Sequence, residues 1–174
     1  SFHKQTEAND VNTEGFVAGS FKNTDYIINA TNDETGQKED GPIRIAGVWK
    51  DGVWTSLGIG TLQLENLTSF EHGSQAFSIS EDGKTVGGCL NDGTYDVIPC
   101  TWTKNDDGTW TYNEYSFPTP STQGAKIEAL SGDGKIASGW VTSENGGRMP
   151  IIWTSPTDYT IIGQDEYEFP DGVA

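Results

Sequence analysis

The sequence predicts an all-β protein built from about three related units. Apolar residues make up only 33% of the 174 residues, yet aromatic residues reach 11%, which supplies a thin core that a disordered acidic chain would lack. The 22 glycines indicate many turns. No segment has a convincing apolar period of 3.6 residues, so almost no helix is expected. The length suits one domain, and residues 1–174 are treated as a single repeat domain.

A pattern that recurs after 51 residues defines the second and third units. AFSISEDGKTVGG at 76–88 matches IEALSGDGKIASG at 127–139, and the Trp of DVIPCTWT at 96–103 matches the Trp of RMPIIWTS at 148–155. The first unit is a looser copy that contains VNTEGFVAGS and IRIAGVWKDGVW. The units cover approximately residues 8–58, 74–118 and 125–163.

Each unit is expected to contain four short strands separated by Asp-Gly or Asn-Gly type turns. A polar insertion at 22–41 in the first unit is interpreted as an elongated loop. Four strands in roughly 50 residues is the spacing of β-propeller blades. The predicted fold is therefore a propeller-like array of about three four-stranded antiparallel blades.

Three blades leave apolar faces uncovered, because propellers usually close with about four to eight. Three arrangements satisfy this constraint: a piece of a larger propeller, a homodimer that completes a ring, or an open array. Residues 170–174 resemble the start of a fourth unit, and the chain begins at Ser1. We expect a piece of a longer protein rather than a self-completed ring.

The order of these motifs resembles the HAF repeat family of extracellular proteins. That repeat combines Ser-x-Asp-Gly, an apolar strand ending in Trp, a turn with Asp-Gly, and Leu-Gly. Residues 49–58 followed by 74–88 carry one full copy, whereas the third unit lacks Leu-Gly after Trp153. The resemblance implies a propeller-like fold, no shared catalytic residues, and export to a secreted, cell-surface or periplasmic location of bacterial type.

The net charge of −16 disfavours nucleic acid as a partner, because phosphate would be repelled. No apolar stretch is long enough to span a bilayer. Cys89 and Cys100 flank a predicted hairpin and would face each other if its turn were centred between Thr94 and Tyr95. A disulfide and two buried free thiols are both compatible with this spacing, and export would favour the disulfide.

Residues for catalysis or metal binding do not gather in the sequence. Only His3 and His72 could act as imidazole bases, and neither lies in a nucleophile motif. Two cysteines and two histidines do not make a zinc site. Acidic turns at 105–107 and 32–34 would suit irregular Ca²⁺ loops, but Asn and Asp are the usual residues of turns. The sequence thus predicts no enzyme, no metal and no cofactor.

Repeated residues are interpreted as scaffold. The segment Ser80–Thr85 resembles the Asp-box of sialidase propellers, in which Ser and Asp side chains satisfy backbone groups of a turn. The recurring Trp49, Trp102 and Trp153 are assigned to packing between units.

Aromatic residues interpreted as non-repeating are the candidates for ligand contact, namely Tyr95, Tyr112, Trp140 and Tyr159. The predicted function is that of a non-catalytic exported repeat module for protein–protein contact or surface assembly. An alternative is a carbohydrate-binding module that uses loop aromatics, and a weaker one is part of a glycoside-active propeller. The expected partner is a protein or glycan at a cell surface.

Overall fold

The computed structural model describes residues 6–32, 35–93, 97–118, 121 and 123–163, and it confirms an all-β fold. Apart from one 3-10 turn at Leu64–Asn66, the regular structure of these residues is β-strand. The strands form open sheets that do not close into a barrel.

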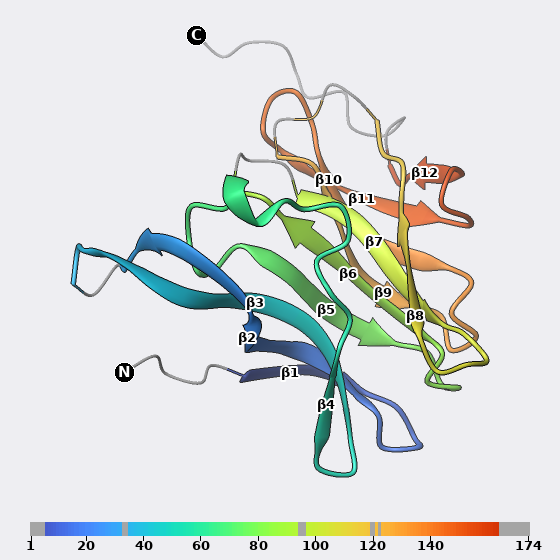
Figure 1. Cartoon of the computed structure of the whole chain (residues 1–174). Helices are drawn as coiled ribbons and strands as arrows, with labels where there is room; N and C mark the ends of the chain where they lie inside the picture. The colour runs from blue at the N-terminus through green and yellow to red at the C-terminus, as the bar shows by residue number, and fades with distance from the viewer. Residues whose placement is uncertain (1–5, 33–34, 94–96, 119–120, 122, 164–174) are drawn as a thin grey trace, which may run out of the picture.

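In the described part of the chain, twelve strands make three consecutive four-stranded antiparallel meanders (Figure 1). In chain order they are β1 (Thr6–Val11), β2 (Val17–Thr31), β3 (Lys38–Lys50) and β4 (Val53–Ser56) in unit 1; β5 (Gly73–Ile79), β6 (Thr85–Asn91), β7 (Val97–Lys104) and β8 (Trp110–Glu114) in unit 2; and β9 (Ala125–Leu130), β10 (Ala137–Thr142), β11 (Arg148–Trp153) and β12 (Tyr159–Ile161) in unit 3. The first two meanders join into one eight-stranded sheet, and the third is a separate four-stranded sheet.

The polar insertion at 22–41 is mostly strand, so its interpretation as a loop is wrong. It lengthens the β2–β3 hairpin. After an irregularity the two strands pair again, from Ile27 opposite Pro42 to Thr31 opposite Lys38. The insertion forms strand because its buried and exposed residues alternate, although its composition is mostly polar. Ile28 and Ala30 are buried, and the residues between and after them face solvent.

Both junctions between units have the same geometry. The first strand of each later unit lies against the first three strands of the unit before it, β5 on β1–β3 and β9 on β5–β7. A parallel backbone bridge marks each junction, Arg44–Gly73 at the first and Val97–Gly124 at the second. Structurally equivalent residues can therefore be assigned across all three units.

A β-bulge recurs at the equivalent place in the first strand of every unit. The extra residues are Asn9, Phe77 and Glu128. Glycine stands beside each bulge on the second strand, at positions 19, 88 and 139. A Cβ at Gly88 would lie 2.0 Å from the carbonyl oxygen of Gln75, and the other two sites are as tight. Backbone contact at the bulge therefore requires glycine.

In units 1 and 2, the residue after the bulge links its unit to the next one. The Ile79 backbone N–H donates to Asp10 Oδ2 at 2.9 Å, and the Ser78 hydroxyl donates to the same oxygen at 3.0 Å. Ser78 Oγ in turn accepts a hydrogen bond from the Leu130 backbone N–H at 3.1 Å. One chain of hydrogen bonds therefore crosses both junctions.

The repeated Ser and Asp residues act as scaffold, as the sequence predicts. In unit 2, Ser80 Oγ donates to Asp82 Oδ1 at 2.6 Å and accepts from the Thr85 backbone N–H at 2.9 Å. Ser131 and Asp133 make the same bonds in unit 3. These side chains satisfy backbone donors of the turn between the first and second strands.

Two of the repeated tryptophans lie fully buried in the core. Trp102 belongs to the apolar cluster shared by units 1 and 2, and Trp153 lies in a second cluster, where its Nε1 donates to the Ser116 carbonyl of unit 2 at 2.7 Å. The Trp153 bond confirms packing at the junction of units 2 and 3, whereas the packing of Trp102 between units stays a prediction. Trp49 of unit 1 is only half-buried.

Replacing Gly88 by Ala should destabilise the protein by about 1–3 kcal/mol, since the new methyl group would overlap the Gln75 carbonyl. The free energy of unfolding in urea measures the effect. Gly147→Ala is the matched control, because its nearest atom would be 3.5 Å away. Equal stability of the two variants would contradict the tight contact at the bulge.

Candidate functional site

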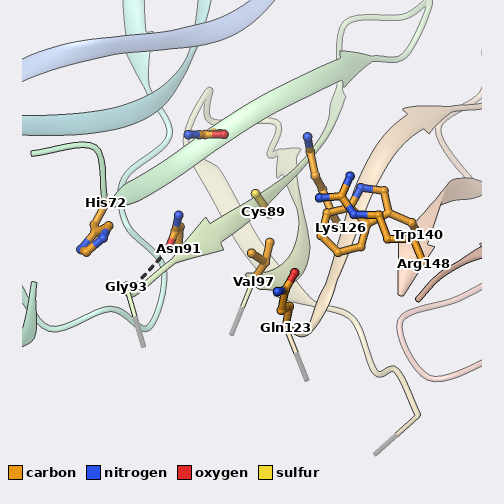
Figure 2. Close-up of a pocket in the computed structure, with 10 residues that line it drawn as sticks. His72, Cys89, Asn91, Gly93, Val97, Gln123, Lys126, Trp140 and Arg148 are labelled. Carbon is orange, nitrogen blue, oxygen red and sulfur yellow. Dashed lines mark hydrogen bonds between the residues drawn. The ribbon is translucent and has the colours of Figure 1, made fainter. Parts of the chain in front are cut away.

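A cavity of about 380 Å³ opens where units 2 and 3 meet, and it is the candidate binding site (Figure 2). Cys89 and Val97 of unit 2 line one part of it, and Lys126, Trp140 and Arg148 of unit 3 line another. The site thus joins strands β6, β7, β9, β10 and β11.

Arg148 and Trp140 form the most distinctive contact of the cavity. The Arg148 guanidinium carbon lies 4.1 Å from the centre of the Trp140 ring, which is a cation–π contact. Figure 2 shows the two side chains next to each other. They are brought together by sheet register, since Trp140 pairs with Pro150, and Arg148 projects from the same face two residues earlier. Among the described residues, Arg148 forms no ion pair with a carboxylate.

Glu128 holds the neighbouring groups in place. Its Oε1 accepts a hydrogen bond from Trp140 Nε1 at 3.2 Å and lies 3.4 Å from Lys126 Nζ. Lys126 Nζ also sits 3.6 Å from the centre of the Phe77 ring. The cationic side of the cavity is therefore oriented by one carboxylate and one aromatic ring, and Arg148 keeps its charge available.

His72 and Cys89 both line the cavity, but their chemistry is not that of an activated pair. Burial lowers the pKa of His72, against the opposing influence of Asp92 and Glu71. Its Nδ1 is buried and has no hydrogen-bond partner among the residues that the structure describes. Burial raises the pKa of the Cys89 thiol to about 12. A nucleophilic cysteine needs the opposite shift.

The register of the β6–β7 hairpin differs by one residue from the predicted one. Cys89 pairs with Pro99 and Cys100 with Gly88, so the two side chains point to opposite faces of the sheet. Both are free, buried thiols, so of the two alternatives compatible with the spacing the structure has the free thiols and not the disulfide. The assumed turn centre between Thr94 and Tyr95 lies outside the described residues.

The four aromatic residues predicted to contact a ligand lie in different places. Trp140 lines the cavity, whereas Tyr95 lies outside the described residues. Tyr112 and Tyr159 are not among the residues that line it, and they pair in register with Trp102 and Trp153. Unit 1 pairs two tryptophans at the same place. Tyr112 and Tyr159 therefore occupy repeated positions, and their interpretation as non-repeating was wrong.

Sequence reasoning missed the cations of the site, although a signal was present. Lys126 and Arg148 stand 51 residues after Gln75 and Val97, so each places a positive charge at a position that is neutral in unit 2. In the part of the chain that the structure describes, no three metal-ligating side chains gather, and no helix is long and apolar enough to cross a membrane.

No family model, no curated protein and no solved structure matches this chain. The resemblance to HAF repeats therefore stays a prediction from the motifs alone.

The two thiols should react with a disulfide reagent such as dithionitrobenzoate only when the protein unfolds. Burial raises the pKa of both, so the reactive thiolate is scarce in the folded protein at pH 8. Unfolded, unreduced protein should titrate two thiols. Finding none would show that a disulfide forms despite the register.

Proposed function

We propose that this chain is a non-catalytic, exported repeat module of propeller-like architecture that contacts a partner protein. Its contact site is the surface made by Lys126, Trp140 and Arg148. The group it recognises is a carboxylate of that partner.

The observation that carries this proposal is an arginine stacked on tryptophan at the rim of a cavity, in a chain of net charge −16. Contact with the ring restricts the guanidinium, and a guanidinium held on an aromatic face can still donate its N–H groups to a planar carboxylate. Arginine and tryptophan are also the residues that most often dominate protein contacts.

Two features support a role without catalysis. The residues repeated in the units satisfy backbone groups of turns and bulges, as Ser80 and Asp82 do. Within the described ranges, no hydrogen bond joins His72 to Cys89, and burial raises the pKa of that thiol.

An acidic saccharide is the second candidate ligand. Trp140 favours it, because aromatic rings bind the apolar faces of sugars while Arg148 would pair with a uronic acid carboxylate. The guanidinium already covers one face of that ring, so the protein partner is preferred.

An oligoglutamate peptide should shift the Trp140 indole N–H resonance in a ¹⁵N correlation spectrum. Arg148→Ala should weaken binding by about tenfold, since a charge-assisted hydrogen bond is worth about 1.5–3 kcal/mol. Lys38→Ala is the matched control, because Lys38 is an exposed cation outside the cavity.

An oligogalacturonate that binds more tightly than the peptide, with the same dependence on Arg148, would replace the protein partner by the saccharide. Absence of a shift with either probe, measured at a concentration at which the chain is monomeric, would reject the site.

A further inference from the structure

The first strand of unit 1 exposes positions that are buried at both internal junctions. Ile79 of unit 2 is only 6% exposed, but the equivalent Val11 is 61% exposed. Likewise Ala76 and Ile127 are fully buried, whereas the equivalent Ala8 is exposed. We call the side of unit 1 that carries Ala8 and Val11 the leading face.

The opposite side of unit 3 is uncovered in the same way. Pro99 of unit 2 is fully buried beneath unit 3, but the equivalent Pro150 is exposed. Ile136, which is equivalent to Thr85, is 47% exposed. We call the side of unit 3 that carries Ile136, Ser138 and Pro150 the trailing face. Inside the chain, a trailing face always meets the leading face of the next unit.

Side-chain sizes indicate which leading face fits this trailing face. At the second junction Gly87 faces Ile127, and a Cβ on Gly87 would lie 2.8 Å from the isoleucine Cγ2. Trailing Ser138 replaces Gly87, and leading Ala8 replaces Ile127. A larger residue on one face is thus matched by a smaller one on the other, so the leading face of this same chain fits.

Charges agree with this match. Lys126 of unit 3 lines the cavity beside Cys89 and Val97 of unit 2. The residues equivalent to Cys89 and Val97 in unit 3 are Trp140 and Arg148, and the residue equivalent to Lys126 in unit 1 is Glu7. Glu7 of a second copy would therefore lie beside Trp140 and Arg148.

The surroundings of two carboxylates, Glu128 and Glu7, are compatible with pairing between Glu7 and Arg148. Glu128 beside Trp140 is already paired with Lys126, so the trailing face keeps the positive charge of Arg148. Glu7 contacts Arg44 at 3.1 Å while 46% of its side chain stays exposed, so it has room for a second partner.

The hydrogen bond that links neighbouring units inside the chain has neither its acceptor on the trailing face nor its free donor on the leading face. Ala129 stands where Asp10 and Ser78 accept a backbone N–H of the next unit, so unit 3 offers no acceptor. The Val11 backbone N–H needs none, because it donates to Asp10 Oδ1 at 2.9 Å. Contact between the two faces would therefore not leave the Val11 N–H unpaired.

We propose that a second copy of this chain places its leading face on the trailing face, and that two such contacts close a ring of six units. Each contact joins the leading face of one copy to the trailing face of the other, and a twofold axis exchanges the two contacts, so the dimer interface as a whole is isologous. This inference rests on the proposed function, because it identifies the partner of Arg148 and Trp140 as Glu7 of the second copy.

Light scattering on a sizing column measures the molar mass and so tests the ring. The salt concentration should be physiological or higher, so that the charge of −16 on each copy is screened. The wild-type chain should have twice the 18.8 kDa of one chain. Val11→Asp and Ile136→Asp should each give monomers, because each removes one face of both contacts. Val53→Asp is the matched control, an exposed valine on β4 outside both faces, and should stay dimeric.

Mixing the Val11→Asp and Ile136→Asp variants should restore a dimer, because one intact contact can then form. A wild-type monomer at every concentration, or a dimer that both substitutions leave intact, would overturn the proposal. Circular dichroism shows whether each variant keeps its fold.

Charge reversal separates this inference from the proposed function. Glu7→Arg and Arg148→Glu should each weaken the dimer at least tenfold, and the double variant should regain most of that loss. If the chain stays monomeric but oligoglutamate still shifts Trp140, the self-contact is rejected and the proposed function stands. If Arg148→Glu changes neither association nor peptide binding, both are rejected.

Discussion

One backbone feature, a β-bulge in the first strand of each unit, sets the geometry of the whole array. The bulge brings two strands so close that only glycine fits beside it, as at Gly88. It also turns the following side chain toward the next unit, where Asp10 and Ser78 accept the N–H groups of Ile79 and Leu130. Because both junctions use the same device, the units meet in the same way each time.

Much of this architecture follows from the sequence, because the repeated residues serve the backbone. The 51-residue spacing of Ser80 and Ser131 predicts equivalent turns, and both side chains make the same bonds. The long β2–β3 hairpin was missed, because Ile28 and Ala30 are too few among polar neighbours to show a strand by composition. The bulges could not be foreseen either, since an unpaired residue leaves no mark in a repeat of constant length.

The candidate site was predictable only in part. Trp140 was found because it departs from the repeat, and Arg148 departs from it in the same way. Their stacking depends on sheet register, which a one-residue slip would abolish. The same sensitivity decides between the disulfide and the two free thiols, because Cys89 and Cys100 lie on opposite faces once the register moves by one. Burial of residues at the two ends of the array could not be predicted either, because it depends on which units are neighbours.

The most direct test of this account is the hydrogen exchange rate of two amides under native conditions. The N–H groups of Ile79 and Leu130 donate across the junctions to Asp10 and Ser78, so they should exchange only when the units separate. Protection close to the free energy of global unfolding is the predicted result. If Leu130 exchanges much faster than the rest of β9, the bonds between units do not hold the array together.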